Sequence, residues 1–85
     1  MVMTTLVENV AAAQQWRETC GYVGRGGVVV VLDGEVQSWG ITLRNPGHWR
    51  PGCVAVDDAG KSWTAIIGSE QDGALLWLPN EPVLN

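Results

Sequence analysis

Basic residues are scarce in this chain, and their scarcity limits the partners that it can bind through charge. Only five of the 85 residues are Lys or Arg, whereas nine are Asp or Glu, so the formal net charge is −4. Proteins that bind nucleic acids without sequence preference neutralise phosphates with clustered Lys and Arg. We therefore expect an acidic protein that has no general nucleic-acid binding.

Cysteine and histidine are also rare. The two cysteines, Cys20 and Cys53, and the single histidine, His48, are too few for a disulfide framework and lack the paired spacing of a structural zinc site. His48 lies close to Cys53 in sequence, as the base of a thiolate nucleophile can do. Cys53, however, begins an apolar segment, where a thiol usually packs as a small hydrophobic group. We expect no catalytic residue, no metal and no cofactor, and therefore no enzyme.

Long hydrophobic runs are absent. The longest, "GVVVVL", is too short to cross a bilayer, and the start "MVMTTLVENV" lacks the basic residues and apolar run of a signal peptide. We expect one domain over residues 1–85, with a cytoplasmic location, reduced thiols and no membrane association.

Phenylalanine is absent, whereas there are five tryptophans. Trp16, Trp39, Trp63 and Trp77 fall in segments that we predict to be helix or strand. One interpretation is that they replace Phe as the bulky core residues. The other is that some of them line an interface or an apolar pocket, because Trp combines a large apolar surface with an N–H group that needs a partner.

The N-terminal part of the chain has the pattern of an amphipathic helix. Gly21 is a typical helix stop, so we predict a helix over about residues 5–20. We expect the glycine-rich segment "GYVGRGG" that follows to be a helix stop and strand entry rather than a phosphate-binding loop, because such a loop precedes a helix and here it follows one. Apolar residues recur at steps of three or four along one stripe of the helix, at Leu6, Val10, Ala13, Trp16 and Cys20.

From about residue 27 to residue 78, short β-rich segments alternate with turn residues, as in an antiparallel sheet. Asp33-Gly34 is a strong hairpin sequence. The predicted fold is α+β, with one N-terminal helix packed on a five-stranded antiparallel β-meander and an extended tail over residues 79–85. The predicted strands are Val28–Leu32, Glu35–Leu43, Cys53–Asp57, Lys61–Ile67 and Gly73–Leu78.

The first predicted strand is apolar on both of its faces, which is typical of a strand that is covered twice. One helix covers one face of the sheet, and no remaining segment readily covers the other. We therefore expect a partner chain on the second face, most simply in a homodimer.

The loop "LRNPGHWRPG" between the second and third predicted strands is the one local cluster of basic residues, and no acidic residue interrupts it. Its Arg and Trp side chains either stiffen the loop by stacking or contact a partner. The candidate contact residues are Arg44, His48, Trp49 and Arg50 in the loop, with Trp39 and Trp63 on a face of the sheet.

The chain has a distinctive overall pattern over most of residues 22–79. The segments that carry it are "YVGRGGVVVVLDGEVQSW", "PGHWRPGCVAVD" and "SWTAI". In this pattern it resembles small uncharacterised bacterial proteins, some of which are carried as gene cassettes on mobile elements such as integrons. The resemblance implies an accessory bacterial protein in the cytoplasm and assigns no functional residues.

Taken together, these patterns favour a small non-enzymatic interaction protein, homodimeric, that binds or modulates another protein. The alternative is a small-ligand-binding module with a Trp-lined pocket between the helix and the sheet or between subunits.

Overall fold

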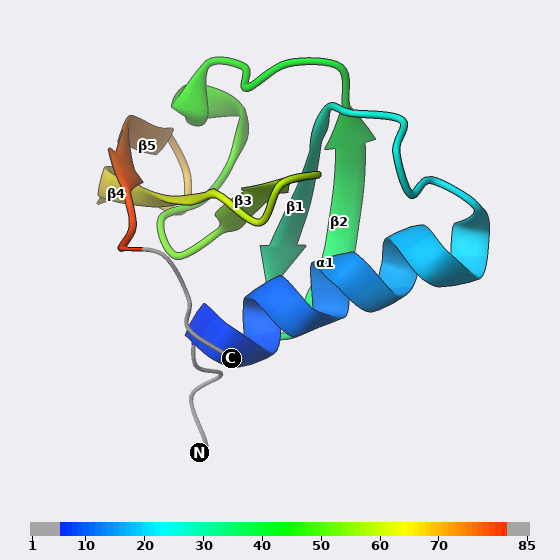
Figure 1. Cartoon of the computed structure of the whole chain (residues 1–85). Coiled ribbons are helices and arrows are strands. Elements are labelled where there is room, and N and C mark those ends of the chain that lie inside the picture. Colours follow the sequence, from blue (N-terminus) through cyan, green and yellow to red (C-terminus); the bar gives the residue numbers. More distant parts are fainter. Residues whose placement is uncertain (1–5, 82–85) are drawn as a thin grey trace.

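The computed structural model describes residues 6–81, which form one helix, a short 3-10 turn and a five-stranded antiparallel sheet (Figure 1). The α+β class with one N-terminal helix is confirmed. In chain order the elements are α1 (Leu6–Cys20), β1 (Val28–Leu32), β2 (Glu35–Gly40), the 3-10 turn η1 (Pro46–His48), β3 (Val54–Asp57), β4 (Ser62–Ser69) and β5 (Gly73–Pro79).

The strand order is β2-β1-β3-β4-β5, which corrects the prediction of a simple meander. β1 pairs with both β2 and β3, so the chain passes over β1 between β2 and β3. We call residues 41–53 the crossover; Figure 1 shows it in green, arching from the end of β2. The valines Val28–Val31 are buried, so β1 is best placed in the centre of the sheet. β2, which exposes Glu35 and Gln37, is suited to an edge.

The β1–β2 hairpin has the predicted two-residue turn. Asp33 and Gly34 both have positive φ, at 51° and 80°, as a type I′ turn requires. The amide of Gly34 also donates to Asn9 Oδ1 of α1 at 2.8 Å. The turn is therefore fixed both by its own sequence and by the helix above it.

Three predicted strand ends differ from the structure. β2 ends at Gly40 rather than Leu43, because the chain leaves the sheet there to begin the crossover. β4 and β5 extend further than predicted, to Ser69 and Pro79. The amide of Asn80 donates to the Ser62 carbonyl at 2.9 Å, so the start of the predicted tail is held against β4. Residues 82–85 of that tail lie outside the described residues.

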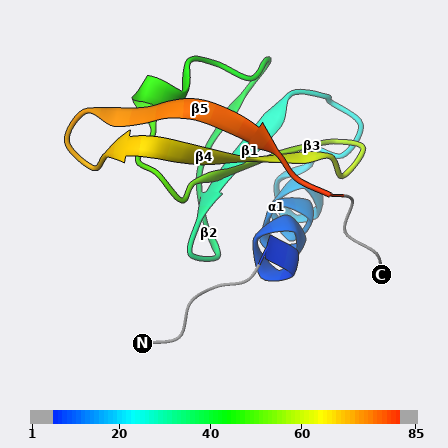
Figure 2. The same ribbon diagram turned by 90° about the vertical axis from the view of Figure 1, so that its left-hand side faces the viewer.

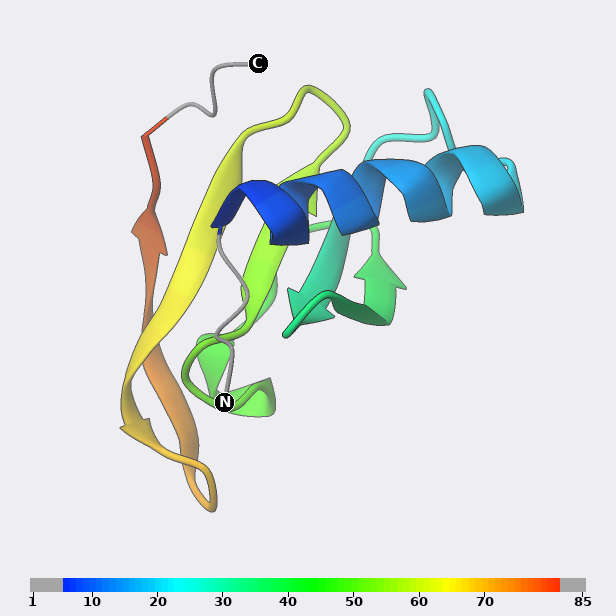
Figure 3. The same cartoon turned by 90° about the horizontal axis from the view of Figure 1, so that it is seen from below.

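α1 covers one face of β1, β2 and β3, as Figure 3 shows. Its buried side chains include Asn9 and Arg17, whereas Cys20, which we placed on the apolar stripe, is exposed. The helix ends as predicted at Gly21, whose φ is 74°. The core between α1 and the sheet combines Val10 and Ala13 of the helix with Val29, Val31, Val54 and Val56 of the sheet.

The second face of β1 is covered by the chain itself, which corrects the expectation that no remaining segment readily covers it. Leu43 and Trp49 of the crossover pack against a second core that contains Val28, Val30 and Ala55. This cover ends before the far part of the β4–β5 hairpin, which extends well beyond α1 (Figures 2 and 3). Exposed apolar surface is therefore concentrated at the hairpin rather than over β1.

Candidate functional site

A pocket of about 390 Å³ lies between the crossover and the sheet face that α1 leaves free. Val28 and Val30 of β1 form its apolar floor, and Ser38 and Gly40 of β2 line one side. This crossover pocket differs in place from the helix–sheet pocket suggested by the sequence, because a packed core occupies the space beneath α1.

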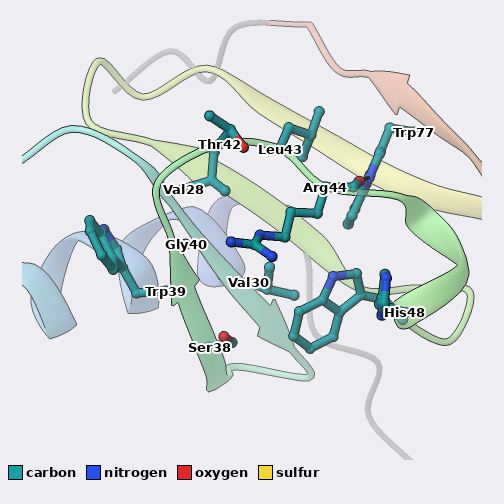
Figure 4. A pocket seen from close by; sticks show the side chains of 11 residues that line it. Val28, Val30, Ser38, Trp39, Gly40, Thr42, Leu43, Arg44, His48 and Trp77 are labelled. Atoms are coloured by element: carbon teal, nitrogen blue, oxygen red, sulfur yellow. Dashed lines mark hydrogen bonds between the residues drawn. The ribbon is translucent and has the colours of Figure 1, made fainter.

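The crossover and β5 supply the other lining residues. Thr42, Leu43 and Arg44 come from the crossover before η1. His48 and Trp49 come from η1 and the residue after it, and Trp77 comes from β5. Figure 4 shows the Arg44 side chain extending over Val30 toward β2, with His48 at the opposite end of the pocket from Ser38.

Hydrogen bonds hold the crossover in place over the pocket. Trp77 Nε1 donates to the Arg44 carbonyl at 2.6 Å. The amide of Ala74 donates to the Trp49 carbonyl at 2.8 Å. Asn45 Oδ1 accepts from the Gly47 amide at 2.8 Å, which caps η1 at its start. These bonds fix the backbone of the crossover, and they come from β5 and Asn45 rather than from stacking of the loop's own Arg and Trp side chains.

A close backbone contact adds to these bonds. Gly73 has φ of 85°, and a Cβ at this position would collide with the Gly47 carbonyl. β5 is therefore in direct contact with η1, and only glycine fits the contact.

Arg44 and His48 are the ionisable side chains that line the pocket, and within residues 6–81 no Asp or Glu lines it. The other arginines are engaged elsewhere: Arg17 and Arg50 form ion pairs, and Arg25 lies over the Tyr22 ring. The Arg44 guanidinium is exposed and has no hydrogen bond or ion pair to any side chain or backbone group of residues 6–81. The pocket thus presents an unpaired cation above an apolar floor.

The structure brings Arg44, His48 and Trp49 together, and it separates the other candidates from them. Arg50 points to Glu70, with 3.9 Å between Nη1 and Oε1, in an exposed ion pair. Trp39 lines the pocket at one edge, but its indole points away from Arg44 and His48 (Figure 4) and donates to the Gly26 carbonyl. Trp63 is half-buried in the second core and does not line the pocket.

Trp77 is the aromatic lining residue that the candidate set missed. It lies on β5, far from the crossover in sequence, and no local motif connects "GALLWLP" with "LRNPGHW". All five tryptophans are half-buried, which is the burial expected of a side chain with both a packing surface and a polar N–H.

The described residues give little support to a reactive thiol or to a metal site. Cys53 is buried, and desolvation raises the pKa of its thiol against the opposing effect of Arg50, so the thiolate is disfavoured. Within residues 6–81, no group of three His, Cys, Asp or Glu side chains is arranged to hold a metal ion. In the same part of the chain, no helix is long and apolar enough to cross a membrane.

Arg17 holds the glycine-rich segment together, a role that sequence reasoning did not assign to it. The side chain is 3% exposed and donates to the carbonyls of Tyr22, Gly26 and Gly27 at 2.9–3.1 Å. Asp58 lies 3.6 Å from Arg17 Nη1 and also accepts from the Gly26 amide at 3.0 Å. The segment is a fixed helix-to-strand connection and not a free loop.

No protein-family model matches the chain, and comparison with curated proteins and with solved structures gives no significant match. Functional inference therefore depends on the geometry of the chain itself.

Proposed function

We propose that this protein is a small non-enzymatic interaction protein that forms a homodimer through its edge strand β5. The observation that carries the proposal is that, within residues 6–81, β5 has no strand on its outer edge and contains no charged residue. The crossover bonds this edge at its start, where the Ala74 amide donates to the Trp49 carbonyl, and no strand follows the edge beyond it in that part of the chain. Natural proteins usually protect such an edge with Lys, Pro or a bulge, because unpaired backbone groups are a template for another strand. In β5, "GALLWLP", only the terminal Pro79 provides such protection.

The side chains of the β4–β5 hairpin support the same proposal. Leu75, Leu76 and Leu78 of β5 are 70%, 47% and 46% exposed, and Ile67 of β4 is 61% exposed. Since side chains of a strand alternate between its faces, Leu75 emerges on one face of β5 and Leu76 and Leu78 on the other. An apolar surface on both faces of one hairpin is a common feature of a strand that is buried on association.

A second copy of the chain is the occupant that fits this edge. Two copies of β5 can pair antiparallel about a twofold axis, which places the same leucines on both sides of a closed interface. Pairing joins the two sheets into one continuous sheet and satisfies the backbone groups of both edges that the crossover does not already bond. The net charge of −4 opposes association only weakly at this site, because β5 itself carries no charge.

The test is the oligomeric state of a variant that carries both Leu75→Lys and Leu78→Lys. We expect the unaltered protein to be dimeric in sedimentation equilibrium at micromolar concentration, and the double variant to be monomeric with an unchanged circular dichroism spectrum. Lysines on both faces of the paired strands bring four like charges into the desolvated interface, and this raises the dissociation constant by at least about a hundredfold.

Val23→Lys is the matched control, because Val23 is 63% exposed and lies outside the hairpin. It should leave the dimer intact. Two results would refute the proposal. One is that the unaltered protein stays monomeric at about 100 µM, roughly the dissociation constant of the weakest specific dimers. The other is that the double variant stays dimeric.

A further inference from the structure

We infer that the crossover pocket binds a small organic acid, with a planar apolar body in the pocket and its carboxylate on Arg44. This inference goes beyond self-association: it concerns a ligand and a pocket that the crossover forms with β1, β2 and Trp77 of β5. It depends on the unpaired cation, on the apolar floor and on the absence of lining carboxylates within the described residues.

Arg44 is suited to bind the carboxylate of the ligand. Its guanidinium has no partner within residues 6–81, whereas the structure pairs or stacks the other arginines. Guanidinium presents parallel N–H donors that match the two oxygens of a carboxylate. The backbone that carries Arg44 is itself held by the Trp77 indole, so the side chain starts from a fixed point. His48, at the end of the pocket, adds a ring N–H donor.

The floor and walls of the crossover pocket are suited to the apolar body of the ligand. Val28 and Val30 are buried floor residues, and Leu43, Trp49 and Trp77 line the pocket with half-buried apolar surface. Indole rings pack well against planar ligands. The volume of about 390 Å³ lies at the lower end of the range for small-molecule sites, which fits a ligand of one or two rings.

The charge of the pocket also excludes other classes of ligand. Among residues 6–81, no lining carboxylate would compensate a cationic ligand beside Arg44. A polyphosphate would need several cations, but the described lining residues offer one arginine and one histidine. In a protein of net charge −4, a cationic pocket with no Asp or Glu among its described lining residues is a local exception that selects a small monoanion.

The test compares three probes that share one planar ring and differ in charge: benzoate, benzamide and benzamidine. Indole N–H signals of the tryptophans are followed by NMR during titration of each probe. We expect benzoate to shift the Trp49 and Trp77 signals in a saturable way and to leave the Trp16 signal unchanged. Benzoate should bind at least about tenfold more tightly than benzamide, and benzamidine more weakly still.

Arg44→Gln is the informative variant, because Arg44 is exposed and its side chain makes no hydrogen bond or ion pair within residues 6–81. It should abolish the preference for benzoate over benzamide. Arg25→Gln, which also removes an exposed arginine but one outside the pocket, should keep that preference. The titrations are repeated with the Leu75→Lys, Leu78→Lys variant, so that loss of self-association is separated from loss of ligand binding.

Three results would overturn the inference. Benzamidine could bind as tightly as benzoate, or Arg44→Gln could keep the preference for the acid. The third result is that no probe shifts the Trp49 and Trp77 signals at concentrations up to about 10 mM. A dissociation constant above that concentration is too weak for a specific site, even for such a small ligand.

Discussion

Trp77 donates its indole N–H to the Arg44 carbonyl at 2.6 Å and so links β5 to the crossover across 33 positions of sequence. Trp77→Phe keeps an aromatic ring and removes this donor. We expect a loss of about 1 kcal/mol in the free energy of unfolding, the usual net value of one hydrogen bond. We also expect weaker benzoate binding, because the backbone of Arg44 loses its anchor. Urea denaturation and NMR titration measure the two effects.

Trp63→Phe serves as the comparison, since Trp63 lies outside the pocket and its indole makes no hydrogen bond within residues 6–81. It should leave benzoate affinity unchanged. If both variants weakened benzoate binding equally, the hydrogen bond to Arg44 would have no special role.

Arg17 is expected to be the most sensitive charged position in the chain. Arg17→Met keeps much of the apolar stem but removes the charged donor to three partly buried carbonyls and leaves Asp58 without its cation. We expect destabilisation of about 3 kcal/mol, because several hydrogen bonds from one buried charged group are lost together. Chemical denaturation gives the total, and hydrogen exchange at Gly26 and Gly27 shows whether the loss begins in this segment.

Arg25→Met gives the scale for an exposed arginine, because Arg25 only lies over the Tyr22 ring at 5.2 Å. It should cost less than about 1 kcal/mol. Equal destabilisation by the two substitutions would mean that Arg17 contributes only through packing.

Ile67 has a φ of 62°, a conformation that a β-branched side chain adopts at a cost. Ile67→Asn places there a residue that tolerates the left-handed region, and little buried surface is lost, because Ile67 is 61% exposed. In the monomeric Leu75→Lys, Leu78→Lys background, we expect stabilisation by about 0.5–1 kcal/mol, from relief of part of that cost. Thermal and urea unfolding provide the measurement.

Ile41→Asn is the matched substitution for this prediction, since Ile41 is 72% exposed but has no positive φ. It should bring no gain in stability. The explanation from backbone strain is wrong if Ile67→Asn destabilises the protein as much as Ile41→Asn does.

Burial raises the pKa of the Cys53 thiol above its ordinary value of 9.0, and this links stability to alkaline pH. The unfolded chain ionises this thiol at its ordinary pKa, whereas the folded chain keeps it protonated to higher pH. The stability that it contributes is therefore fully present below about pH 8 and is lost as pH rises through the folded pKa. Urea denaturation across this range should show the free energy of unfolding falling faster for the unaltered protein than for Cys53→Ala.

Cys20→Ser should keep the pH dependence of the unaltered protein, because Cys20 is exposed. The same exposure predicts that one of the two thiols reacts rapidly with a thiol reagent in the native state and the other only on unfolding. Parallel pH curves for the unaltered protein and Cys53→Ala would contradict the assignment to Cys53.

The elements of the fold were predictable because local chemistry determines them. Asp33-Gly34 permits positive φ at both turn positions, and Gly21 permits the left-handed helix end. The strand order was not predictable in the same way. Sequence neighbours usually pair, but here the crossover is long enough to pass over β1, and the burial of Val28–Val31 on both faces favours the centre of the sheet.

The candidate site was predictable in part for a related reason. Arg44, His48 and Trp49 are close in sequence, and so their clustering is a local property. Trp77 joins them only because β5 lies beside η1, a relationship of tertiary structure. The burial of Arg17 likewise depends on carbonyls that converge from the glycine-rich segment once the helix has docked.

The attachment of the crossover to β5 has a consequence for how the two proposed sites communicate. The bond from Trp77 to Arg44, the bond from Ala74 to Trp49 and the contact of Gly73 with Gly47 all join the cover of the pocket to the edge strand. An acid beneath the crossover and a second copy along β5 therefore act on the same backbone connections. Thermodynamic linkage then requires reciprocity: the factor by which the acid changes the dissociation constant of the dimer equals the factor by which dimerisation changes the affinity for the acid.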